Sequence, residues 1–371
     1  MIETRLCENK DWENLKKLWI KAFHDSDSFT DWFFDNRFAP DYSACTYEDG
    51  QLISAMQSWP MFLNIRNRIV PSSIITGVNT EPAFAGRGYM GKTFRFYMAA
   101  MREKGIVLCP MMPLNMPTYF SRGFYPVTDT AFVSCPKDKP YICSHSQHYS
   151  ILPLDMIENS SLLYTCYSRF SKDYSGIVMR SLSDFTLKMN DYISDGGKCA
   201  AAMKNREVVA YCIYYKHDDI YGEEFISNDK DSTMALVSNF SDTGYDMTMK
   251  MSAKNSVDVA CLETEIKPQG AMGTVNAQKL METVCNDREH IIRLTDDSLF
   301  CNSGTYYMDG AQADKTPHIE MEAGRLVQLI TGYTSLEELE QRGQAKINDI
   351  TAAAEISSML PKLDCFIVDE Y

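Results

Sequence analysis

Hydrophobic and polar positions follow a helical period at the start of the chain and a strand period soon after it. Apolar side chains at helical spacing predict an amphipathic helix between positions 11 and 25, with Leu15, Leu18, Trp19 and Phe23 on one side. A second, shorter helix is predicted over 28–38. The alternation that follows predicts strands joined by tight turns, at residues 43–47, 51–59, 61–64, 68–70 and 72–80.

A glycine-rich loop at residues 81–92 links the last of these strands to a helix predicted over 93–104. Glycines allow the backbone to turn tightly, and the unpaired first-turn amides of a helix attract an anion. Arg87, Lys92 and Arg95 add positive charge beside the loop. The loop therefore predicts a phosphate site, although glycines that only shape a strand-to-helix turn would give the same pattern. Its spacing differs from that of the P-loop and of the Rossmann fingerprint.

Residues 136–150 are polar and bounded by prolines, which predicts a linker. Within this segment Cys143, His145 and His148 form a conceivable metal cluster. A polar linker that happens to contain histidines explains the three residues better, and we expect no metal.

The chain after position 150 alternates between the two periods again. Its first half is expected to contain helices at 162–171, 182–192 and 233–242 and strands at 198–205, 207–216 and 246–251. Its second half is expected to contain a strand entering a helix at 272–284, strands at 291–296, 299–303 and 304–309, and helices at 325–331 and 335–341. Ser335 and Glu338 form a capping box for the last helix. The apolar run 365–368 predicts a packed C-terminal tail, since most termini are polar and frayed.

The composition is that of a globular protein. Its 371 residues, 45% hydrophobic and 23% charged, fit two or three domains at roughly 100–200 residues each. No apolar run reaches the roughly 18 residues of a membrane span, and acidic residues stand where a signal peptide needs a basic and then an apolar region. The 12 cysteines lack C-x-x-C spacing, which indicates buried reduced thiols. We expect a cytoplasmic protein that does not enter a membrane.

The net charge of −14 lies in the later part of the chain, because residues 151–270 carry −6 and residues 271–371 carry −9. A chain this acidic repels nucleic acid and anionic membranes, and it attracts cationic small molecules or peptides. Charge that serves only solubility would look the same.

Two segments carry a resemblance to a known family. Residues 76–90, with the sequence T-G-V-N-T-E-P-A-F-A-G-R-G-Y-M, resemble the acetyl-CoA motif of the GNAT N-acyltransferase superfamily. A short strand at 106–109 follows, and residues 119–124, Y-F-S-R-G-F, resemble the Y-x-x-x-G-F segment of the same superfamily. The two motifs occur in the order and at the spacing that GNAT proteins use.

The whole chain resembles the enhanced-intracellular-survival (Eis) acetyltransferases. The resemblance implies an α/β fold with a GNAT domain at 1–140, a second, degenerate GNAT-like domain without a CoA site at 141–270, and a sterol-carrier-protein-like αβ domain at 271–371. It also implies a homo-oligomer, with a hexamer as one form. N-myristoyltransferases share the duplicated GNAT fold, but their substrate motifs are not visible in this sequence.

The resemblance implies an acetyltransferase with acetyl-CoA as co-substrate and a cationic amine as acceptor, such as a polyamine, an aminoglycoside or a lysine side chain. Tyr119 takes the position of the general acid, and the terminal carboxylate of Tyr371 that of the base, with Asp369 and Glu370 as alternatives. The residues implied to contact acetyl-CoA are Val78, Asn79, Thr80, Gly86, Arg87, Gly88, Tyr89, Met90, Gly91, Leu114 and Asn115.

The acetyl-CoA motif departs from the family pattern at two positions. Ala85 stands where the family has Arg or Gln, and Met90 where it has Gly or Ala. The alternative hypothesis is therefore a non-catalytic binding protein with a degenerate CoA site, whose third domain holds an apolar ligand. An aromatic-rich set near the N-terminus either lines an acceptor groove or packs in the core, at Trp12, Trp19, Trp32, Phe33, Phe34, Trp59 and Phe62.

Overall fold

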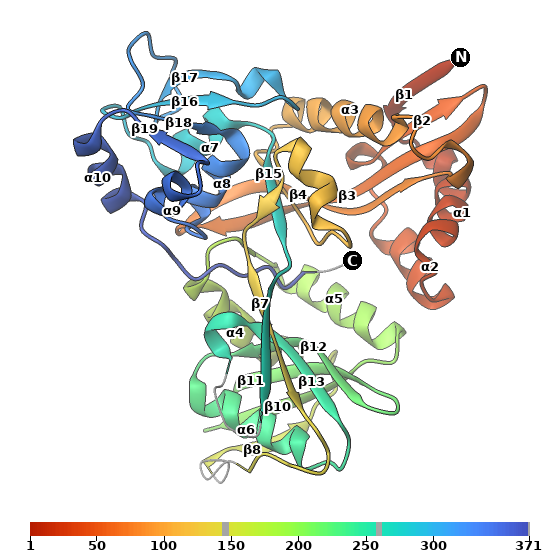
Figure 1. The fold of residues 1–371 in the computed structure, drawn as a ribbon. Helices are drawn as coiled ribbons and strands as arrows, with labels where there is room; N and C mark the ends of the chain where they lie inside the picture. The colour runs from red at the N-terminus through yellow and green to blue at the C-terminus, as the bar shows by residue number, and fades with distance from the viewer. Residues whose placement is uncertain (143–147, 257–261, 370–371) are drawn as a thin grey trace. The chain divides into compact units, whose positions relative to one another are not determined.

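The computed structural model describes residues 1–142, 148–256 and 262–369 and divides into two compact units (Figure 1). The first unit comprises Met1–Thr128, Ser175–Val178 and Gln269–Tyr371, and the second comprises Asp129–Tyr174 and Met179–Pro268. The first and last segments of the chain thus share one unit, whereas the resemblance implies three consecutive domains.

The first unit is built on an eight-stranded sheet with the order β1-β2-β3-β4-β5-β15-β6, and β9 pairs with β3 beside this path. Its longest strands are β3 and β4, which form one hairpin around a turn with positive φ at Arg66 and Asn67. The sequence had divided this hairpin into several shorter strands. The bounds are β1 Ile2–Leu6, β2 Ala44–Glu48, β3 Gln51–Ile65, β4 Arg68–Thr80, β5 Leu108–Met111, β6 Tyr125–Pro126, β9 Ile177–Val178 and β15 Ala271–Thr274.

Helices cover both faces of this sheet. The predicted N-terminal helices are α1 (Trp12–Phe23) and α2 (Asp27–Asn36), and their apolar residues pack with Ala55 of β3. Helix α3 (Tyr89–Glu103) packs with Met56 of β3 and Ile75 of β4 in a separate cluster. Because neighbouring residues of a strand point to opposite faces, α1 and α2 lie on one side of the sheet and α3 on the other.

The C-terminal part of the first unit has a second, four-stranded sheet with the order β17-β16-β18-β19. The capping box of Ser335 and Glu338 is confirmed, but the strand expected at 299–303 is wrong, because Phe300–Asn302 form a 3-10 turn. The bounds are β16 Ile291–Thr295, β17 Gly304–Tyr307, β18 Ile319–Glu322, β19 Ala345–Ile347, α7 Ala277–Val284, α8 Ala323–Thr331, α9 Leu336–Gln341 and α10 Ile350–Met359.

Strand β15 joins this part to the N-terminal sheet. It pairs with β5 over Ala271–Thr274 and with β6 over Ala271 and Met272. Two arginines add side-chain bonds: Arg66 Nε donates to the carbonyl of Ile330 at 2.7 Å, and Arg102 Nη1 donates to the carbonyl of Val275 at 2.8 Å. A continuous sheet therefore explains why the two ends of the chain form one unit.

The C-terminal tail is held against the first unit as far as the structure describes it. Phe366, Ile367 and Val368 are buried. The amide of Ser175 donates to the carbonyl of Asp364 at 2.9 Å, and the amide of Phe366 donates to the carbonyl of Ser175 at 3.2 Å. The apolar run before the terminus is thus packed, as its sequence predicted.

The second unit has a seven-stranded sheet with the order β14-β7-β13-β12-β11-β10-β8. Its helix α6 begins directly after β12, and the Asp229 carboxylate caps α6 by accepting a hydrogen bond from the amide of Ser232. This negative charge disfavours an anion at the N-terminus of α6. The bounds are β7 Asp129–Cys135, β8 Ser150–Pro153, β10 Lys198–Lys204, β11 Glu207–Lys216, β12 Ile220–Ser227, β13 Met247–Ser252, β14 Glu263–Pro268, α4 Ser160–Phe170, α5 Leu182–Ser194 and α6 Lys230–Ser241.

Across the described ranges, no helix combines the length and the hydrophobicity that spanning a membrane requires.

Candidate functional site

Strands β4 and β5 separate part-way along their length. They pair in parallel at Ser72 with Leu108 and at Ile75 with Met111, and a bulge follows at Thr76, because Ser58 of β3 pairs with Ile75 while Gln57 pairs with Gly77. Beyond the bulge, residues 77–80 have β3 as their only strand neighbour in the described part of the chain. The other edge of β4, with Val78, Asn79 and Thr80, can therefore pair with a ligand.

The glycine loop follows this open edge and ends at the N-terminus of α3. Gly86 and Gly88 have φ of 75° and 83°, and a Cβ at either position would meet no atom within 4 Å. Glycine is therefore needed there for the backbone conformation and not for space. Gly88 is the N-cap of α3, and no side chain caps this helix end.

The helix begins at Tyr89, four residues before the position that the sequence predicted. Tyr89, Met90 and Gly91 thus form its first turn, whose amides have no partner within the helix, while the amide of Lys92 already donates to the carbonyl of Gly88 at 3.1 Å. Three amides and the positive end of the helix dipole make this turn suitable for a phosphate group.

Two guanidinium groups lie beside this first turn. A Cβ on Gly91 would lie 3.5 Å from Arg122 Nη2 and 3.8 Å from Arg95 Nη1. Burial lowers the pKa of Arg122, and Arg95 lowers it further. Two like charges held this close favour the binding of an anion between them.

Arg122 belongs to this candidate site by its position, although it is not among the residues that the sequence predicts. It lies in the 3-10 segment η4 (Met116–Arg122), about thirty residues after the loop. Its position directly before the glycine of the Y-x-x-x-G-F segment was the available signal. Arg122 brings a positive charge to the first turn of α3, whereas Ala85 in the loop has none.

Tyr119 lies in the same 3-10 segment as Arg122. Its ring centroid is 6.5 Å from that of Phe94, in the second turn of α3. Burial raises the pKa of Tyr119, and Arg122 only partly opposes this effect. The phenol therefore stays protonated near neutral pH, as a proton donor must.

The other predicted site residues differ in their surroundings. Leu114 is 96% exposed, and Asn115 precedes η4 without capping it through its side chain. Glu370 and Tyr371 lie outside the described residues, and Asp369 is buried at the end of the described tail. The structure thus brings together the open edge of β4, the loop, Arg95, Arg122 and Tyr119.

The N-terminal aromatic residues mostly belong to the core. Trp19, Phe33 and Phe34 are buried, and the rings of Trp19 and Phe33 stack at 4.6 Å. Trp59 lies beside the Arg37 guanidinium, and Phe62 is 53% exposed.

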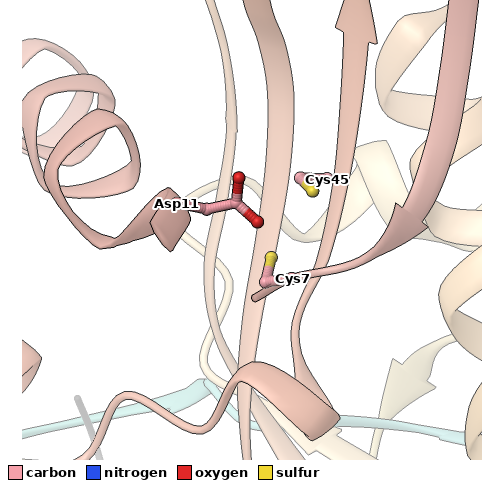
Figure 2. Close-up of side chains that lie close together, drawn as sticks. All are labelled: Cys7, Asp11 and Cys45. Atoms are coloured by element: carbon pink, nitrogen blue, oxygen red, sulfur yellow. The ribbon is translucent and has the colours of Figure 1, made fainter. Parts of the chain in front are cut away.

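Cys7, Asp11 and Cys45 form a cluster that could be mistaken for a metal site (Figure 2). The Asp11 carboxylate already accepts hydrogen bonds from both Arg5 Nη atoms, at 2.7 and 2.9 Å, from the Tyr47 hydroxyl and from the Glu8 amide. Burial opposes these bonds, but they lower the pKa of Asp11 to about 2. The pKa of the Cys7 thiol is raised by the hydrogen bond between Cys7 and Cys45 and by the burial of Cys7.

A cation would therefore meet a carboxylate that Arg5 already neutralises and a thiol that stays protonated, so the cluster is structural. Of the other candidate metal ligands, Cys143 and His145 lie outside the described residues.

An acidic hollow lies beside η4. It has a volume of about 330 Å³, and its lining includes Phe120 and Ser121 together with the acidic residues Asp296, Asp297 and Glu322. The Tyr125 hydroxyl donates to Glu322 Oε2 at 2.5 Å. This charge favours a cationic group near the segment that carries Tyr119.

The comparisons with known proteins identify a domain family and the fold of the chain. Residues 3–127 match the acetyltransferase (GNAT) domain family. Three crystal structures are similar to this chain, and each match covers 100% of this chain and 100% of the other chain. They are a conserved protein of unknown function and probable N-acyltransferase from Enterococcus faecalis (16% identity, TM-score 0.84) and a GCN5-related N-acetyltransferase from Anabaena variabilis (13% identity, TM-score 0.83). The third is Eis1 from Mycobacterium abscessus (14% identity, TM-score 0.77). No curated protein sequence matches the chain. The structural matches establish the fold of the whole chain. Because the sequence identities are low, they establish the fold alone.

Proposed function

We propose that this chain, which contains a GNAT acetyltransferase domain at residues 3–127 and shares its fold with Eis1 over its whole length, transfers the acetyl group of acetyl-CoA to an amine. The observation that carries the proposal is the open edge of β4, which leads directly to the uncapped N-terminus of α3 between Arg95 and Arg122. When bound, acetyl-CoA supplies an activated acetyl thioester.

The residues present fit acetyl-CoA. The backbone of Val78, Asn79 and Thr80 would bind the pantetheine arm, and residues 86–91 would bind the pyrophosphate. Leu114 and Asn115 are proposed as further contacts. Arg95 and Arg122 supply the charge that Ala85 does not, so the departures from the family pattern do not by themselves indicate a lost site.

Proton transfer requires one donor and one acceptor from this chain. An amine attacks only in its neutral form, while alkylammonium groups have pKa values near 10. Tyr119 is proposed to donate a proton to the departing thiolate, and the terminal carboxylate of Tyr371 to accept the proton of the amine. Asp369 and Glu370 are the alternatives if the terminus lies too far away.

The role of the terminal carboxylate can be tested without changing any side chain. Adding a few residues after Tyr371 displaces the carboxylate, and we expect kcat to fall at least tenfold while acetyl-CoA binding stays the same. Equal turnover of the extended and the unextended protein would transfer the role to Glu370 or Asp369.

We propose a cationic acceptor, such as a polyamine, an aminoglycoside or a lysine side chain. The net charge of −14 and the acidic hollow beside η4 support a cation, and the proposal extends to a homo-oligomer by resemblance to Eis proteins. Because salt screens such attraction, the KM for the amine should rise with ionic strength.

Two measurements test the proposal as a whole. Calorimetry with acetyl-CoA asks whether the donor binds, and a CoA-release assay over polyamines, aminoglycosides and lysine peptides asks whether an amine accepts the acetyl group. Binding without release on any amine would favour the alternative, a non-catalytic binding protein. Absence of binding would contradict the proposed site.

A further inference from the structure

Gln57 and Asn79 are two carboxamide side chains in the middle of the N-terminal sheet. They are 1% and 4% exposed, and all four of their side-chain polar atoms lack a hydrogen-bond partner within the described ranges. Nearly all buried polar groups in folded proteins are hydrogen-bonded, because desolvation without a new bond is costly. Two buried amides whose groups have no partner in the described chain therefore have hydrogen-bonding capacity left for a bound group.

The two amides lie on the same face of the sheet. Gln57 pairs with Gly77 and Asn79 with Ala55, so they occupy diagonal positions on adjacent antiparallel strands, within reach of each other. Ala55 packs with the core under α1 and α2, whereas Met56 and Val78 pack with the cluster of α3. The amides therefore face the α1 and α2 side, opposite to α3.

Gly77 makes room for the Gln57 side chain. A Cβ on Gly77 would lie 2.6 Å from Gln57 Oε1 and 2.2 Å from a ring carbon of Trp19. Gln57 Oε1 thus lies over the backbone of β4 next to the Trp19 ring, directly beyond the bulge at which β4 leaves β5.

We propose that Gln57 and Asn79 bind the acceptor through an uncharged group beside its reacting amine, and so determine which amines are acetylated. The inference rests on the proposed function. With the phosphates of acetyl-CoA at 86–91 and its pantetheine arm along β4, the acetyl-accepting amine is expected at the bulge, where Gly77 and Gln57 lie. A carboxamide carries no charge and can both donate and accept a hydrogen bond. A hydroxyl group can do the same, so we expect the enzyme to prefer amino alcohols to alkylamines of the same length.

The experiment compares pairs of amines in which a hydroxyl replaces a methyl group: ethanolamine with propylamine, and 3-amino-1-propanol with butylamine. The wild-type protein should favour the hydroxyl member of at least one pair about tenfold in kcat/KM, about the effect of one buried hydrogen bond. In Gln57→Met, which keeps the length of the side chain, the two members should become equal. Asn79→Leu should have the same effect on selectivity.

The unfolding temperature provides a second measurement. Replacing a buried amide without partners by an apolar side chain of similar shape should leave the unfolding temperature unchanged or raise it. In the wild type, the amino alcohol should raise this temperature more than the matched alkylamine does, and Gln57→Met should abolish the difference. Thr30→Val is the matched control, because Thr30 Oγ1 is also buried without a partner in the described chain but lies in α2. It should not change the selectivity.

Unchanged selectivity in Gln57→Met would overturn the inference. If the unfolding temperature of this variant also fell, the amides would bind structural water instead of the amine. Binding in the thermal measurement is read separately from turnover. A wild-type protein that distinguishes the amines in binding but acetylates none would contradict the proposed function and leave the role of Gln57 standing.

Discussion

Gly88 combines two roles at one residue, since it allows the turn of the loop and leaves the N-terminus of α3 open. We expect Gly88→Val to abolish acetyl-CoA binding measured by calorimetry, because a β-branched residue resists φ of 83° and the turn would move. Gly105 is the matched control, because it follows the other end of α3 with φ of 78° and equally free space. Gly105→Val should cost similar stability and bind acetyl-CoA as the wild type does.

The guanidinium group of Arg122 is expected to contribute to the binding of acetyl-CoA. Arg122→Ala removes one of the two cations beside Gly91, and charge-assisted bonds to phosphate contribute about 1.5–3 kcal/mol. The Kd for acetyl-CoA should therefore rise about 10- to 100-fold, and its salt dependence should weaken. Arg169→Ala, which removes a surface cation paired with Glu207 in the second unit, should change neither. Equal binding by both variants would remove Arg122 from the site.

At the scale of elements, the sequence predicts best where a single period dominates. The stripe of Leu15, Leu18 and Trp19 predicted α1 closely, because amphipathic periodicity is a local property. The start of α3 was placed four residues late, since Gly91 and the loop chemistry hid the first turn. Helix α10 was not predicted at all, because its alanine- and serine-rich sequence has no clear apolar stripe.

The candidate site is predictable from the sequence only in its local parts. The loop, the strand residues that include Asn79, and Tyr119 follow from short motifs. The place of the Arg122 guanidinium beside Gly91, and of the Gln57 and Asn79 side chains on one face of the sheet, depends on contacts between distant segments. Strand register decides which face a side chain takes, and the bulge at Thr76 that sets this register leaves no pattern in the sequence.

Helix α10 is also the element that should respond to pH. The His290 ring bonds to Asp287 through Nδ1 at 2.6 Å and to Glu355 of α10 through Nε2 at 2.9 Å. Burial opposes protonation, but the two carboxylates raise the pKa of His290 above its ordinary 6.5. A raised pKa in the folded state means that this stabilisation is complete below about pH 6.5 and is lost as the pH rises through the folded value.

We therefore expect the unfolding temperature of the first unit to fall by about 1–3 °C more between pH 6 and pH 8.5 in the wild type than in Glu355→Gln, because the pair is partly exposed. Thermal unfolding of both proteins at the two pH values measures the difference. The same pH dependence in both proteins would show that Glu355 does not hold the protonated ring.

At the scale of the whole molecule, the N-terminal and C-terminal segments of the chain share one compact unit. The resemblance implies a GNAT domain at residues 1–140, and the first compact unit joins Met1–Thr128 to Ser175–Val178 and Gln269–Tyr371. Strand β15 lies between β5 and β6, so without it β6 has no strand partner in the described structure. The segment that carries Tyr119 and Arg122 comes directly before β6 and would lose its anchor.

A fragment of residues 1–128 should therefore not fold by itself. It lacks β15, the carbonyl of Val275 that Arg102 binds and the carbonyl of Ile330 that Arg66 binds. It also exposes Leu108, which is fully buried in a cluster shared with Met272 and Leu326. Exposed apolar surface and an open strand edge promote aggregation. We expect the fragment to show no cooperative thermal unfolding and no acetyl-CoA binding, while the full chain shows both. A monomeric fragment that unfolds cooperatively would show that the N-terminal segment is a domain in its own right and that β15 only extends its sheet.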